Sequence, residues 1–183
     1  LADGVEILDV DDEGGYVSIY PSRIAGVTLS TSDVYFYTLN GSGEIDRLIL
    51  NGVTGDTIDY CYITSAKTSN EGMNLSGTYQ YLLDGESHTL SGSTIYGAGV
   101  GAAAMIYEDG SFRSFQQLSK VTLTQLTSTY AMSENQKYQL ADQVQVLLKD
   151  SQGNLYPTTL CSVNSENYTL IGWYDHLEYT GGG

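Results

Sequence analysis

The chain contains few residues of several kinds, and each shortage excludes a class of protein. It holds two Cys, two Pro and two His in 183 residues. The cysteines, Cys61 and Cys161, are too few and too far apart in sequence for a structural zinc site. They form either a disulfide, which would close a long loop and stabilise the fold by roughly 4–5 kcal/mol, or two free thiols.

Positive charge is also scarce, because seven Lys and Arg face 22 Asp and Glu, for a net charge of −15. An acidic surface repels phosphate backbones and anionic lipids, so neither nucleic acid nor a membrane is expected as a partner. Solubility alone is sufficient to explain this acidity.

No apolar run is long enough to span a bilayer, and no charged segment followed by an apolar segment stands at the start. We expect no membrane insertion by this chain. Because the sequence starts in the middle of a repeated phrase, we interpret it as part of a longer protein, and the missing leader says nothing about export.

Tyrosine, in contrast, is abundant: there are sixteen Tyr and only three Phe, while charged residues make up 16% of the chain. Tyrosine suits a half-buried pleated surface, where its hydroxyl reaches water. This composition is typical of an extracellular β protein rather than of a cytosolic enzyme.

Apolar and polar residues alternate along most of the chain, which predicts strands. Asp84-Gly85 and Asp109-Gly110 each separate two alternating runs, and this dipeptide is the strongest short signal of a hairpin. Gly97, Gly99 and Gly101 do not precede a helix, so they form no phosphate-binding loop, and we interpret them as strand glycines or as a loop leading into a strand.

The start of the chain recurs near its end. Residues 1–15 (LADGVEILDVDDEGG) align without a gap on residues 140–154 (LADQVQVLLKDSQGN). The first copy carries Gly4 and several β-branched residues, so both copies are predicted to be strands even though the second could be helical by propensity. The identical pairs are Leu1/Leu140, Ala2/Ala141, Asp3/Asp142, Val5/Val144, Leu8/Leu147, Asp11/Asp150 and Gly14/Gly153.

The repeat predicts an all-β fold made of tandem antiparallel five-stranded barrels of SH3 or OB size, over 1–54, 55–119 and 120–183. Residues 1–54 lack the strand that precedes the second copy, and residues 120–183 lack the strand that follows the first. Either the units contact one another, or 1–54 and 120–183 supply each other's missing strand in one split barrel.

Several stretches resemble the β-rich regions of Gram-positive bacterial surface proteins that carry S-layer homology domains. They are residues 45–66 with the Val53-Thr54-Gly55-Asp56 corner, residues 78–92, residues 143–156, and the aromatic Gly172–Asp175 strand, after which Gly181–Gly183 correspond to a final strand. The resemblance implies an extracellular, wall-associated location and partners among the other domains of a parent protein. The S-layer homology module itself is absent from this chain, so wall anchoring by these residues is not implied, and the family brings no catalytic residues.

The acidic stretch Asp9, Asp11, Asp12 and Glu13, followed by Gly14, has the composition of a calcium loop. The second copy keeps Asp150 and Gly153 but loses the acidic cluster. A tight hairpin common to both copies is therefore the preferred interpretation, and a weak calcium site is the alternative; no other cofactor is expected.

No catalytic constellation is evident. His88 and His176 are the only histidines, and neither adjoins a nucleophile-elbow pattern, so we interpret both as surface or strand residues. A pair of glycosidase carboxylates depends on a separation that sequence does not supply.

Aromatic residues recur at matching places in the two copies, at Tyr35, Phe36 and Tyr37 and at Trp173 and Tyr174. Cross-strand packing explains this recurrence most simply, with contact to a glycan or a protein as alternatives. The sequence thus favours a non-enzymatic spacer or assembly module at a bacterial surface. A carbohydrate-binding module using Tyr35, Tyr37, Trp173 and Tyr174, with cell-wall glycan as its partner, is second, and a wall hydrolase fragment is a remote third.

Overall fold

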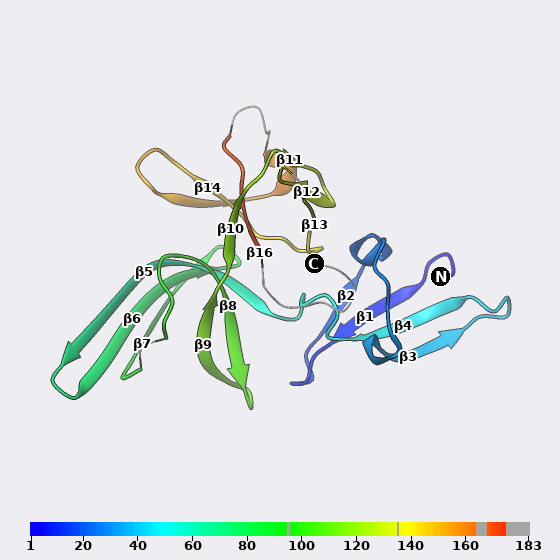
Figure 1. Cartoon of the computed structure of the whole chain (residues 1–183), viewed down its shortest axis with the longest axis horizontal. Helices are drawn as coiled ribbons and strands as arrows, with labels where there is room; N and C mark the ends of the chain where they lie inside the picture. The colour runs from blue at the N-terminus through cyan, green and yellow to red at the C-terminus, as the bar shows by residue number, and fades with distance from the viewer. Residues whose placement is uncertain (95, 135, 164–167, 175–183) are drawn as a thin grey trace. The chain divides into compact units, whose positions relative to one another are not determined.

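A computed structural model of the chain describes residues 1–94, 96–134, 136–163 and 168–174. The predicted all-β class is confirmed: strands dominate the described residues, and their helices are 3₁₀ turns of three or four residues (Figure 1). None of the helices in these ranges is long and apolar enough to cross a membrane.

The chain forms two compact units that interleave along the sequence. The first comprises Leu1–Thr57 and Leu126–Val144, and the second comprises Ile58–Gln125 and the described residues from Gln145 onward. This division differs from the three consecutive segments expected from the sequence, because Leu126–Val144 belongs to the first unit although it follows Ile58–Gln125 in the chain.

The main element of the first unit is a four-stranded sheet in the order β2-β1-β4-β3. Its strands are β1 (Glu6–Val10), β2 (Tyr16–Ile19), β3 (Val34–Leu39) and β4 (Ile45–Asn51). β1 and β2 are antiparallel, as are β3 and β4, but β1 and β4 are parallel. The sheet is therefore mixed, whereas purely antiparallel pairing was predicted.

One face of this sheet forms the core of the first unit. Ile7, Leu48 and Leu50 are at most 2% exposed, and Ile24 and Leu29 from the β2–β3 connection pack against them. That connection contains the 3₁₀ turns η1 (Pro21–Ile24) and η2 (Thr31–Asp33). A smaller sheet in the order β11-β12-β13 also belongs to the first unit, apart from Gln125. Its strands are β11 (Gln125–Leu126), β12 (Tyr130–Met132) and β13 (Lys137–Gln139).

The second unit is built on a five-stranded antiparallel sheet in the order β7-β6-β5-β8-β9 (Figure 1). Its strands are β5 (Asp59–Glu71), β6 (Asn74–Leu83), β7 (Glu86–Gly92), β8 (Gly101–Glu108) and β9 (Ser111–Gln117). The two predicted Asp-Gly hairpins are confirmed, because Asp84-Gly85 joins β6 to β7 and Asp109-Gly110 joins β8 to β9. All four of these turn residues have positive φ, as the tight turn requires.

The first half of strand β8 is made of small residues because both of its faces are buried there. Ala103 and Met105 pack into the cluster around Tyr79 and Phe115, while Ala102 and Ala104 face a second cluster on the other side. β8 begins at Gly101, so Gly97 and Gly99 lie in the preceding loop and are not strand glycines. Of the two interpretations of this glycine stretch, a loop leading into a strand is the correct one.

Two short pairings complete the second unit. Strand β10 (Ser119–Thr122) pairs antiparallel with β16 (Ile171–Tyr174), and β14 (Val146–Lys149) pairs antiparallel with β15 (Leu155–Thr158). The 3₁₀ turn η3 (Leu160–Ser162) follows β15.

The repeat recognised in the sequence is a structural repeat, and the alternative of a helix over 140–154 is wrong. Ile7 lies opposite Ile19 and Val10 opposite Tyr16 in the first hairpin. The shift that takes Leu1 to Leu140 turns these pairs into those that join β14 to β15, since Val146 lies opposite Thr158 and Lys149 opposite Leu155. The same shift places η1 on η3.

The predicted barrels are not found, because no sheet in the described ranges closes on itself. The larger sheets end at β2 and β3 and at β7 and β9. The split barrel is wrong as well, since no sheet of these ranges combines strands of 1–54 with strands of 120–183.

Candidate functional site

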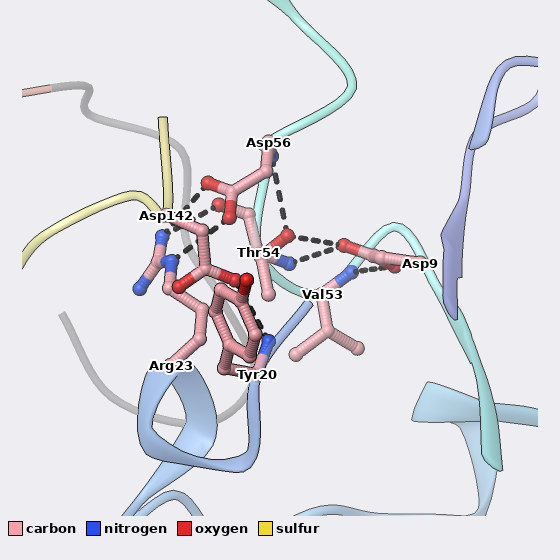
Figure 2. A network of polar contacts seen from close by, with 7 residues as sticks. All are labelled: Asp9, Tyr20, Arg23, Val53, Thr54, Asp56 and Asp142. Atoms are coloured by element: carbon pink, nitrogen blue, oxygen red, sulfur yellow. Dashed lines mark hydrogen bonds and ion pairs between the residues drawn. The ribbon is translucent and has the colours of Figure 1, made fainter. Parts of the chain in front are cut away.

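A buried polar network holds the corner Val53–Asp56, where the chain leaves β4 (Figure 2). Its centre is Asp9 on β1, which is fully buried. Asp9 Oδ1 accepts a hydrogen bond from the Val53 N–H at 3.0 Å, and Oδ2 accepts bonds from the Thr54 N–H at 2.7 Å and the Thr54 hydroxyl at 2.5 Å. The positive φ of Gly55 completes the corner.

This geometry separates Asp9 from the other residues of the predicted calcium cluster. Both of its oxygens are used by donors of the chain, and its side chain shares the buried face of β1 with Ile7. Nowhere in the described ranges do three or more His, Cys, Asp or Glu side chains group as metal ligands.

Arg23 on η1 fastens the other end of the corner. Its Nε and one terminal nitrogen donate to both oxygens of Asp56 at 3.0 and 3.1 Å, and that terminal nitrogen also donates to the Thr54 carbonyl at 3.1 Å. The two side chains are only 13% and 8% exposed. Burial raises the pKa of Asp56 above its usual value, with smaller increases from Asp142 and Asp9, while the hydrogen bond and charge of Arg23 act in the opposite direction.

Asp142 joins the two segments of the first unit. It lies near the end of Leu126–Val144, and its Oδ2 accepts a hydrogen bond from the N–H of Tyr20 in Leu1–Thr57 at 2.8 Å (Figure 2). The network therefore fixes the Val53–Asp56 corner and also holds Asp142, near the end of Leu126–Val144. Its hydrogen bonds join side chains and backbone groups of the first unit, which is the arrangement of a structural lock.

Asp11 and Asp12 occupy the hairpin turn between β1 and β2. Asp11 Oδ1 accepts hydrogen bonds from the N–H groups of Glu13 at 2.9 Å and Gly15 at 2.7 Å. Gly14 follows with a φ of 82°. These local bonds stabilise the turn, in agreement with the hairpin interpretation of this stretch.

An open hollow of about 520 Å³ lies beside this turn, on the face of the four-stranded sheet away from the core. Tyr16 and Tyr35 are each 73% exposed and both line it. It thus combines aromatic rings, carboxylates and an amide, the groups with which proteins contact sugars. The full lining is Leu8, Val10, Asp11, Asp12, Gly14, Tyr16, Tyr35 and Asn51.

The remaining candidate aromatics do not join this hollow. Tyr37 lies opposite Leu48 in the β3–β4 register, so it is on the core face of the sheet and not on the face with the hollow. Trp173 belongs to the second unit, where its ring meets Tyr62 edge-on at 6.0 Å and packs beside Ala102 and Ala104. Tyr174 next to it is half-buried in β16. Trp173 therefore has a packing role.

Both cysteines are free thiols in this structure, where no disulfide joins them. Cys61 points into the core of the second unit and is 4% exposed, whereas Cys161 lies on the surface. Burial, with a smaller contribution from Asp59, raises the pKa of Cys61 to about 12. His88 stacks on Tyr81 across the β6–β7 pair, with ring centroids 5.3 Å apart. His176, Asp175 and Gly181–Gly183 lie outside the described residues.

Sequence reasoning missed Arg23, Tyr16 and Asn51. Tyr16 had a detectable signal, because it closely follows the acidic turn, whereas Asn51 had none, since only the β1–β4 pairing places it opposite Val10. Arg23 had none, since only the fold brings η1 against the corner after β4. No protein family model, no curated protein and no solved structure matches this chain.

Proposed function

We propose that this chain is a non-enzymatic structural module of an extracellular protein, a spacer or assembly unit of the kind found in S-layer-associated surface proteins of Gram-positive bacteria. The observation that supports it is the duplicated strand–turn–strand–3₁₀ unit, with one register in both copies. Each copy is organised by hydrogen bonds within its own turn, which suits a repeated building block.

The saturated corner network also supports a mechanical role. Asp9, Arg23 and Asp56 have little exposure and bond to one another's segments and to the backbone, so they hold a chain crossing in place. Buried, fully hydrogen-bonded networks make a fold rigid and specific.

Location is the testable part of this proposal. Antibodies raised against the purified chain should label intact cells that produce the parent protein, and external protease should remove the label. Labelling that appears only after the cells are made permeable would contradict the proposal.

A second candidate function, binding of a wall polysaccharide, is favoured by the hollow between Tyr16 and Tyr35. Sugar rings stack on exposed aromatic faces, and the carboxylates of Asp11 and Asp12 and the amide of Asn51 can hydrogen-bond hydroxyl groups. A wall hydrolase fragment remains the remote third candidate, and strong activity that one carboxylate substitution abolishes would favour it.

The second candidate is tested by titrating the chain with soluble wall polysaccharide while recording NMR spectra. Binding at the hollow should shift the resonances of residues near Tyr16 and Tyr35, and Y16A or Y35A should abolish the shifts. Y37A is the matched control, because Tyr37 is 53% exposed but lies on the other face of the same sheet. If no resonance shifts in any titration, polysaccharide binding is ruled out and the spacer function remains the proposal.

A further inference from the structure

Strand β3 is an edge strand with a large exposed apolar surface. It pairs with β4 on one side and has no other neighbour in the four-stranded sheet formed by the described residues. Tyr35, Phe36, Tyr37 and Leu39 are all about half exposed or more. Natural edge strands are shielded by charges, proline, β-bulges or short length, because an open edge pairs with other chains.

The other long edges carry such protection. β7 contains Glu86 and ends at Gly92, and β9 contains Arg113. β2 lacks a charge but spans only four residues. β3, with the sequence VYFYTL, has six residues and neither charge nor proline, although its register shifts twice against β4. It exposes more large apolar side chains than these other edges, so a covering strand would bury the most apolar surface here.

The second copy of the repeat shows what covers a strand of this type. The shift that takes Leu1 to Leu140 places Val34 on Trp173 and Tyr35 on Tyr174, so the second half of β16 is the counterpart of the start of β3, and its first half is that of the end of η2. β16 pairs antiparallel with β10, with Lys120 opposite Trp173 and Ser119 opposite Tyr174. In the first copy, no strand of the described residues takes the part of β10.

We infer that the open edge of β3 is a docking site for a β-strand of the β10 type, supplied antiparallel by a repeat outside this chain. The strand has the alternating Val-Thr-Leu-Thr pattern of residues 121–124. Because β4 already occupies one edge of β3, the added strand pairs at the other edge, and main-chain hydrogen bonds supply the contact.

This inference rests on the assembly role within the proposed function but not on the cell-surface location. Repeats joined in this way would form a continuous array, each repeat completing the sheet of its neighbour. The experiment below uses the purified chain, so its failure would remove the docking site and leave the antibody result unaffected.

The test extends the full chain at Leu1 with a copy of residues 118–125 and a Gly/Ser linker as long as residues 126–139. Hydrogen exchange of the β3 amides that are not bonded to β4 should slow by about tenfold or more relative to the unextended chain, because each gains a backbone acceptor. The amides of β1 and of the β5–β9 sheet should be unchanged, which also shows that the extended chain has folded.

The matched control carries K120P and V121P in the added copy only. Neighbouring residues direct their N–H groups to opposite edges, so one of the two prolines removes a donor to the ladder, and the protection of β3 should be lost. Equal protection in this control, or none with the unsubstituted extension, would overturn the inference.

A second measurement works without the extension. A peptide of residues 118–125, added to the unmodified chain, should shift the NMR resonances of β3, and F36K should prevent this whereas Y16K, on the opposite edge strand, should not. Shifts confined to β2, β7 or β9 would contradict the inference. Protection of β3 that grows with the concentration of the unextended chain would assign the edge to a second copy and would likewise overturn it.

Discussion

Asp11 and Asp150 perform the same task in the two copies of the repeat. Asp11 accepts hydrogen bonds from the N–H groups two and four residues later, and Asp150 accepts them from Gln152 at 2.9 Å and Asn154 at 2.8 Å. Gly14 and Gly153, the fourth residues of the turns, have φ of 82° and 87°.

A third turn, between β3 and β4, has the same form with an amide in place of the carboxylate. Asn40 accepts from the N–H groups of Ser42 and Glu44, both at 2.9 Å, and Gly43 has a φ of 79°. Three hairpins thus share the pattern Asp/Asn-x-x-Gly, in which the side chain stabilises the turn and the glycine adopts the left-handed conformation.

We predict that Asp11→Asn is tolerated and that Asp11→Ala destabilises the chain. The Asn40 turn shows that an amide oxygen fulfils the role, whereas alanine leaves two N–H groups without their acceptor, at a cost of about 1–2 kcal/mol. Urea denaturation measures both changes. Asp12→Ala, an exposed neighbour, is the control and should stay within about 0.5 kcal/mol; an equal loss in this control would refute the assignment.

The pH dependence of stability should carry a contribution from Asp150. Hydrogen bonds from Asn154, and smaller ones from Gln152 and Tyr156, lower the pKa of Asp150 below its ordinary 3.8. The native state therefore favours the carboxylate, so this stability is present above the unfolded pKa and is lost as the pH falls through the folded pKa.

Thermal denaturation of the native chain and of Asp150→Asn as a function of pH checks this expectation. The difference in melting temperature should be constant near neutral pH and should shrink as the acid range below 3.8 is crossed. Asp12→Asn serves as the matched control at an exposed carboxylate. A difference that grows on acidification would show that the sign is wrong.

Removing the acceptor at the centre of the corner should be costly. Asp9→Ala leaves three buried donors without a partner and should lower the free energy of unfolding by about 3 kcal/mol. Thr54→Val removes one donor and should cost about 1 kcal/mol. The double variant should lose less than the sum, because the two changes act on the same bond.

Urea denaturation of the four proteins in this cycle gives the coupling directly. Asp46→Ala is the control, since Asp46 accepts only an exposed hydrogen bond from Thr38 and its loss should be small. Strict additivity of the Asp9 and Thr54 variants would mean that the bond between them contributes nothing.

Gly101→Ala should be strongly destabilising while Gly99→Ala is tolerated. A Cβ at Gly101 would lie 2.8 Å from the Trp173 ring and 2.9 Å from the Gln117 amide, and the φ of 136° is unfavourable for alanine. The expected loss is about 2–3 kcal/mol. A Cβ at Gly99 meets nothing within 4 Å. Tryptophan fluorescence during urea denaturation compares both variants, and equal midpoints would contradict this packing.

The two thiols should differ in reactivity. At about pH 8 an aromatic disulfide reagent should modify Cys161 rapidly, while Cys61, buried and with a pKa of about 12, should react only after unfolding. Cys161→Ser should abolish the fast phase. Absence of reaction in urea without a reductant would reveal a disulfide instead.

The sequence by itself determined the strands, the Asp-Gly hairpins and the repeat, because alternation, turn residues and positive φ are properties of a few neighbouring residues. The Asp11 and Asp150 turns belong to this class, and comparison of the two copies correctly predicted a hairpin in both.

Only the tertiary structure decided whether the sheets close, which partner each strand takes and what Asp9 does. Parallel pairing of β1 with β4, the burial of both faces of β8 and the approach of Arg23 to Asp56 join residues far apart in the chain. Such contacts depend on which surfaces pack together, and local pattern carries no information about them. For the same reason Asp9 and Asp11, two positions apart, have opposite surroundings: one points into the core, and the other stabilises a turn in water.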